Sequence, residues 1–196
     1  MRLGVRRHRP DGDIDELAGS LLRMRWVRRL ALAGIVWCAG LLATLTPLEG
    51  IPLPTPIALS GVLLALPIFA ITTFAIRRTE IRETGRARRS LYWVWRLLRD
   101  TMPGWLLIAS WLLFAGFLVV GGDPGPPVQE LGAETYAAQI DGRWTAISKS
   151  EYLPMKAQNQ RIHLSVPGGF CVFTAVLSTA LLRREAQQRE AVRSDS

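Results

Sequence analysis

Four long stretches of apolar residues alternate with polar segments along the chain. They cover residues 30–48, 57–76, 104–120 and 164–182, and none of them contains Asp, Glu, Lys, Arg or His. A helix of about 20 apolar residues is long enough to cross the ~30 Å hydrocarbon core of a bilayer. The pattern therefore predicts an all-α membrane protein with a bundle of four transmembrane helices.

Positive charge is concentrated in three of the five segments that flank these stretches. Residues 1–29 and 77–103 each hold 8 Lys and Arg, and residues 183–196 hold 4, whereas residues 47–56 hold none and residues 121–163 hold 4. Short segments rich in Lys and Arg stay on the cytoplasmic side of a membrane. We therefore expect a multi-pass plasma-membrane protein with both termini in the cytoplasm.

This topology divides the chain into five parts. A cytoplasmic basic arm (1–29) precedes three transmembrane helices (30–120), which include a cytoplasmic basic loop at 77–103. An exterior segment (121–163), the fourth transmembrane helix (164–182) and a cytoplasmic tail (183–196) follow. The second half of the basic arm is compatible with a helix along the inner leaflet or with a plain positive flank.

The charge distribution also narrows the class of protein. A net charge of +8 is common in nucleic-acid-binding proteins, but these arginines flank apolar spans, so we expect no nucleic-acid partner. A cleaved signal is disfavoured, because the basic region before the first span is long and three more spans follow. We expect the lipid bilayer as a partner, with anionic lipids at the basic inner face.

The basic loop and the exterior segment each contain a predicted element. Residues 91–100 (LYWVWRLLRD) place aromatic side chains beside arginines, which favours a short helix at the headgroup level, with Ser90 as its N-cap. Outside, Asp141-Gly142 separates two β-capable runs, 136–140 and 143–147, and this dipeptide favours a type I′ hairpin turn. We therefore predict a small β-hairpin.

A helix is predicted to follow the hairpin and to complete a small exterior cap. Ser148 and Ser150 are alternative N-caps for it, Glu151 and Tyr152 open it, and it runs through Arg161 toward the fourth span. In the fourth span, the sequence Pro167-Gly168-Gly169 predicts an interruption near the outer end.

The exterior segment resembles a family of small multi-pass bacterial membrane proteins whose activity is unknown. The shared pattern is a tyrosine-led strand, a glycine turn, a threonine, a Ser-x-x-Glu-Tyr step and an arginine before the last span. The matching positions are Tyr136, Gly142, Thr145, Ser148, Glu151, Tyr152 and Arg161. The resemblance covers about 30 residues and departs at residues 165–169, where those proteins have a Ser-Gly-His-Trp-like element. It implies an architecture and no mechanism.

Chemically active groups are scarce in the sequence. An ionisable residue inside a membrane span usually marks an ion or substrate path, and the four spans contain none. No P-loop, GxSxG or HExxH motif is present, and Cys38 and Cys171 are expected to be small packing residues. At the outer interface, we expect Arg161 to pair with Glu151 and His163 to meet water. The sequence predicts no metal and no cofactor.

These observations favour a non-catalytic accessory or scaffold subunit that contacts another protein or a second copy of itself. A small-molecule or lipid permease is the first alternative. A membrane enzyme that acts on lipid-linked substrates at the outer face is the second. The residues expected to take part in an interaction lie in the exterior segment: Tyr136, Trp144, Glu151, Tyr152, Arg161 and His163.

Overall fold

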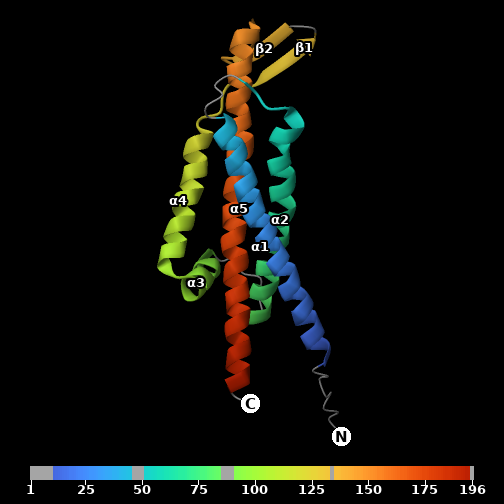
Figure 1. Cartoon of the computed structure of the whole chain (residues 1–196), viewed down its shortest axis with the longest axis vertical. Helices are drawn as coiled ribbons and strands as arrows, with labels where there is room; N and C mark the ends of the chain where they lie inside the picture. The colour runs from blue at the N-terminus through green and yellow to red at the C-terminus, as the bar shows by residue number, and fades with distance from the viewer. Residues whose placement is uncertain (1–10, 46–50, 85–90, 133–134, 195–196) are drawn as a thin grey trace.

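The computed structural model describes residues 11–45, 51–84, 91–132 and 135–194, which form one elongated helical bundle (Figure 1). Its helices and strands, in chain order, are α1 (Asp11–Leu45), α2 (Thr55–Thr84), α3 (Leu91–Thr101), α4 (Gly104–Gly121), β1 (Val128–Gly132), β2 (Thr135–Ile140), β3 (Arg143–Ile147) and α5 (Lys149–Ser194). Helix α1 begins and helix α5 ends at the same end of the bundle, and the strands lie at the opposite end (Figure 1). We call these the terminal end and the sheet end.

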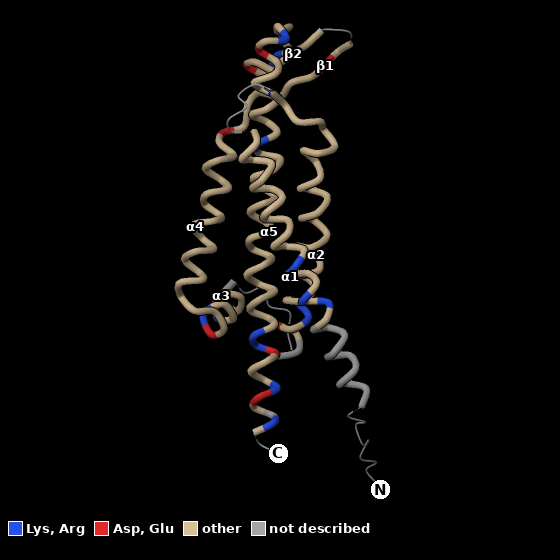
Figure 2. The backbone as a smooth tube through the Cα atoms, in the orientation of Figure 1, with Lys and Arg blue, Asp and Glu red and all other residues tan. Residues whose placement is uncertain are grey.

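Among the described residues, four helices are long and apolar enough to cross a membrane, as the sequence predicts. These candidate spans are Leu22–Leu45, Thr55–Ile81, Gly104–Gly121 and Lys149–Ala191. Figure 2 shows Lys and Arg gathered on α1, α2 and α5 toward the terminal end. Helix α1 is continuous from Asp11 onward, so the described part of the basic arm prolongs the first span and does not form a separate surface helix.

Helix α5 is the central element of the bundle. It has 46 residues, a length of about 69 Å at 1.5 Å per residue. It packs against α1, α2, α3 and α4 and against strands β1 and β2. Leu164, Thr174 and Ser178 on α5 are almost completely buried. A straight path along the bundle axis is therefore filled by a helix.

The fourth span is not interrupted at Pro167-Gly168-Gly169, so this sequence-based prediction is wrong. The α-helix continues through all three residues. A Cβ atom on Gly168 would lie 2.3 Å from the ring of Phe117, and one on Gly169 would lie 2.9 Å from the ring of Phe114. These glycines allow α4 to approach α5 closely, which is the usual purpose of small residues at membrane helix contacts.

The two cysteines also lie at close helix contacts. Both are buried, Cys38 on α1 and Cys171 on α5. A Cβ atom on Gly61 of α2 would lie 3.2 Å from Cys38 Sγ, and one on Gly34 of α1 would lie 2.7 Å from Cys171 Sγ. Gly34 is one helical turn before Cys38, so both thiols pack where α1, α2 and α5 meet. They serve as small packing residues, as expected.

Helix α3 crosses the terminal end of the bundle beside α4 (Figure 1). It matches the helix predicted over residues 91–100, while its expected N-cap, Ser90, lies outside the described residues. Leu97 and Leu98 are buried in the core, whereas Tyr92 and Trp95 are exposed. This division into an apolar and an exposed face is what an interfacial helix requires.

Among the described residues, the sheet contains three antiparallel strands in the order β1-β2-β3. The predicted hairpin is confirmed: Asp141 (φ 51°) and Gly142 (φ 77°) form its turn, and Tyr136 pairs with Ile147. Strand β1 was not predicted. It pairs Val128 with Ala138, and it follows a Gly/Pro-rich spacer that the sequence indicates only as extended chain.

Candidate functional site

Helix α5 begins with a capping box directly after strand β3, which ties the sheet to this helix. Glu151 N–H donates to Ser148 Oγ at 3.3 Å, and Glu151 Oε2 accepts from Ser148 N–H at 2.9 Å and from Ser148 Oγ at 2.8 Å. This reciprocal pattern satisfies backbone donors that a helix N-terminus leaves without partners. The structure therefore selects Ser148 over Ser150 as the cap, and it assigns Glu151 to the same cap.

An aromatic stack fixes the sheet against the side of α5. The rings of Tyr136 on β2 and Tyr152 on α5 are stacked with their centroids 4.5 Å apart, and both residues are buried. The ammonium of Lys156 lies 5.3 Å from the centroid of the Tyr152 ring, a cation–π contact. The structure thus brings together two of the six predicted residues, and their contact has a structural purpose.

Arg161 does not pair with Glu151, which corrects a second sequence-based prediction. The two residues lie ten positions apart on α5, about 15 Å along the helix axis. Arg161 Nη2 instead donates to the carbonyl oxygen of Leu45 at 3.1 Å. Leu45 is the last residue of α1, so the guanidinium stabilises the negative end of that helix dipole.

Three amide side chains next to Arg161 complete a set of loop contacts that the sequence did not predict. Gln160 accepts from Leu53 N–H and donates to the Leu53 carbonyl, both at 2.7 Å. Asn159 donates to the Pro126 carbonyl at 2.9 Å, and Gln158 donates to the Asp123 carbonyl at 3.0 Å. Consecutive helical residues point in different directions, so residues 158–161 hold chain segments on several sides of α5.

A cavity of about 490 Å³ lies beside these contacts, between the N-terminus of α2, the spacer before β1 and α5. Tyr152, Lys156, Asn159 and His163 are among the residues that line it. His163 is exposed at the surface of the bundle. The cavity thus combines one cationic side chain, one imidazole and two amides, those of Asn159 and Gln160, without a lining carboxylate among the described residues.

Trp144 lies apart from the other predicted residues, on the open edge strand of the sheet. It pairs with Gln139, three positions from Tyr136, and side chains alternate between the faces of a strand. Trp144 therefore projects from the face opposite the Tyr136–Tyr152 stack, and its side chain is 52% exposed. A large exposed aromatic residue at an unpaired strand edge is a typical protein-contact feature.

The sheet end therefore offers surfaces for binding, while the side chains of Glu151, Arg161 and the three amides are engaged in holding the fold. In the described part of the chain, no three His, Cys, Asp or Glu side chains are grouped so that they could hold a metal ion. The three candidate catalytic side chains do not share one site. Glu151 caps the start of α5, Arg161 caps the end of α1, and His163 lines the cavity. No family model, curated protein or solved structure matches this chain.

Proposed function

We propose that the protein is an integral plasma-membrane protein that acts as a non-catalytic accessory or scaffold subunit, and that its exterior sheet contacts a partner protein. Trp144 carries this proposal, because it is half exposed on the open strand β3 and lies beyond the apolar spans. Leu131 on β1 is 60% exposed, and Ile140, on the sheet face opposite Trp144, is 43% exposed, so the sheet presents further apolar side chains. The rigid attachment of the sheet to α5 reduces the entropy lost on binding.

The proposed orientation places this sheet outside the cell and both termini in the cytoplasm. The arginine-rich segments at the terminal end support it, because positively charged flanks resist translocation. The permease alternative gains no support from the bundle, since α5 occupies its axis. The enzyme alternative gains none from Glu151 and Arg161, whose side chains are engaged in helix capping.

Photocrosslinking in native membranes tests the proposal. A photoreactive phenylalanine analogue replaces Trp144 in one variant and Asp123, which is also exposed at the sheet end, in the control variant. We expect irradiation to yield one discrete protein adduct from position 144 and none from position 123. A self-adduct would identify a second copy of the chain as the contact. Adducts of equal yield at both positions, or none at either, would contradict the proposal.

A further inference from the structure

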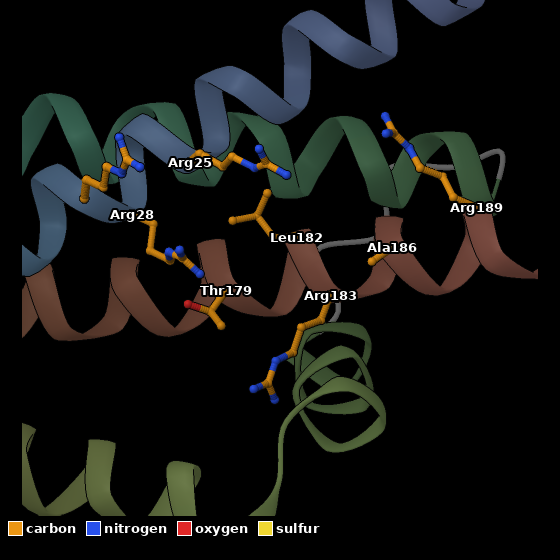
Figure 3. A pocket seen from close by; sticks show the side chains of 8 residues that line it. Arg25, Arg28, Thr179, Leu182, Arg183, Ala186 and Arg189 are labelled. Carbon is orange, nitrogen blue, oxygen red and sulfur yellow. The ribbon is translucent and has the colours of Figure 1, made fainter.

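A cavity lined mainly by arginines lies at the terminal end of the bundle, between α1 and α5. Its volume is about 540 Å³, and the described residues that line it are Arg25, Arg28, Arg29, Thr179, Leu182, Arg183, Ala186 and Arg189. The lining residues of α1 are spaced three and four positions apart, and so are most lining residues of α5. Residues at this spacing share one face of a helix, so a face of α1 and a face of α5 oppose each other across the cavity. In Figure 3, Arg28 points toward Thr179, and Arg25 extends over Leu182 between the two helices.

Two of the five arginines are engaged outside the cavity. Arg183 points toward α3 (Figure 3), where its guanidinium donates to the Thr101 carbonyl at 3.3 Å. The guanidinium of Arg29 lies 5.7 Å from the centroid of the Trp26 ring. The other three arginines, Arg25, Arg28 and Arg189, line the space between α1 and α5 without such a contact.

These three arginines are not neutralised by an ion pair within the described part of the chain. Arg25, Arg28 and Arg189 form no ion pair with any described carboxylate, and no described acidic residue lines the cavity. The Nε atom of Arg28 is buried and has no hydrogen-bond partner. A buried donor without a partner and three cations around one space both favour an anion with several acceptor oxygens.

The depth of the cavity suggests which anion reaches it. Leu182 is the last residue of the apolar stretch of α5, and Arg28 and Arg29 directly precede the apolar stretch of α1. The cavity therefore lies at the border between hydrocarbon and headgroups, where lipid phosphates are found. Basic pockets between membrane helices on the cytoplasmic side are suited to lipids whose headgroups carry several charges.

We propose that this cavity binds a phosphate-bearing anion with two or more negative charges, presented at the inner headgroup layer. Arg25 and Arg28 of α1 bind it from one side and Arg189 of α5 from the other. The anion joins the diverging ends of α1 and α5, so its binding stabilises this end of the bundle. This site lies at the end opposite the exterior sheet, and it does not depend on the contact proposed for Trp144.

Native mass spectrometry of the full-length protein, released from a neutral detergent, tests the proposal. The probes are cardiolipin, which carries two phosphates, phosphatidylglycerol, which carries one, zwitterionic phosphatidylcholine, and inorganic pyrophosphate. We expect cardiolipin to bind more tightly than phosphatidylglycerol. Phosphatidylcholine should dissociate from the protein before detection. The variant Arg25→Gln/Arg28→Gln should weaken cardiolipin binding roughly tenfold or more, because charge-assisted hydrogen bonds are the strong ones.

The matched control is Arg96→Gln/Arg99→Gln, which removes two positive charges from α3 at the same end and should leave binding unchanged. Arg189→Gln is the second test variant. It changes an exposed residue on the other helix and keeps the test valid if the α1 variant does not fold. If pyrophosphate binds and none of the lipids does, and if the Arg25→Gln/Arg28→Gln and Arg189→Gln variants lose that binding, the ligand is a soluble phosphate. Equal losses in test and control variants, or no preference of the wild type for phosphate-rich probes, would overturn the proposal.

Discussion

Arg161 of α5 holds the end of α1 through a hydrogen bond of 3.1 Å from its guanidinium to the Leu45 carbonyl. At the other end of the bundle, Arg183 of α5 makes the same kind of bond, at 3.3 Å, to the carbonyl of Thr101, the last residue of α3. The two arginines lie 22 positions apart, about 33 Å along the helix, which is close to the thickness of the hydrocarbon core. Each arginine thus caps a neighbouring helix, and the two caps are about one hydrocarbon thickness apart.

Replacing Arg161 by methionine should destabilise the bundle. The Leu45 carbonyl would lose a charged donor at a partly buried position, a loss of about 1.5–3 kcal/mol for a hydrogen bond to a charged group. The free energy of unfolding in mixed detergent micelles measures the effect. Arg143→Met is the control, because Arg143 is exposed on β3 at the same end. If both variants unfold alike, the capping role of Arg161 is wrong.

Replacing Gly168 by alanine should loosen the contact between α4 and α5. The added methyl group would meet the Phe117 ring at 2.3 Å, and Phe117 is itself buried. Overpacking of this kind typically costs about 1–3 kcal/mol. Gly116→Ala on α4 is the matched control, because a Cβ atom there meets no other atom within 4 Å. Thermal unfolding of both variants in detergent gives the comparison, and a neutral Gly168→Ala would contradict the close approach described above.

The parts of this fold that can be predicted from the sequence are determined by local sequence signals, and the other parts are determined by contacts with other segments of the chain. The spans follow from the sequence because a bilayer imposes a fixed apolar length. The hairpin follows because Asp141-Gly142 tolerates positive φ at both turn positions. Both signals are local, so no tertiary information is needed to recognise them.

The missed features all depend on a tertiary or strand-pairing partner, and for the glycines and Gln160 that partner is distant in sequence. Pro167-Gly168-Gly169 indicates a helix break when viewed alone, and only the rings of Phe114 and Phe117 reveal the glycines as contact residues. Gln160 belongs to a polar run that resembles a solvated helix face, yet its partner is Leu53, 107 positions away. Strand β1 is short and follows a Gly/Pro spacer, so its pairing with β2 decides its structure.

Replacing Ser148 by alanine should weaken the link between the sheet and α5. The capping box would lose its hydroxyl, and loss of an N-cap typically costs about 1 kcal/mol. We expect faster amide hydrogen exchange at the first turn of α5, with the membrane part of the helix unchanged. Ser150→Ala is the control, since the Ser150 hydroxyl is hydrogen-bonded to the Ser148 hydroxyl, at 2.9 Å, and not to the backbone at the start of α5 among the described residues. We expect the amides of the first turn to exchange more slowly in Ser150→Ala than in Ser148→Ala. The reverse order would favour Ser150 as the cap.

The orientation of the bundle can be tested with two single cysteines. In a background with Cys38→Ala and Cys171→Ala, the variants Asp123→Cys and Ser194→Cys place one thiol near the sheet end and one near the C-terminal end of α5, both at exposed positions. Because the arginine-rich end should remain in the cytoplasm, a membrane-impermeant maleimide should label position 123 in intact cells and position 194 only after permeabilisation. Labelling at position 194 in intact cells would contradict the predicted topology and indicate the opposite orientation. It would also move the arginine cavity between α1 and α5 to the outer leaflet, and Trp144 into the cytoplasm.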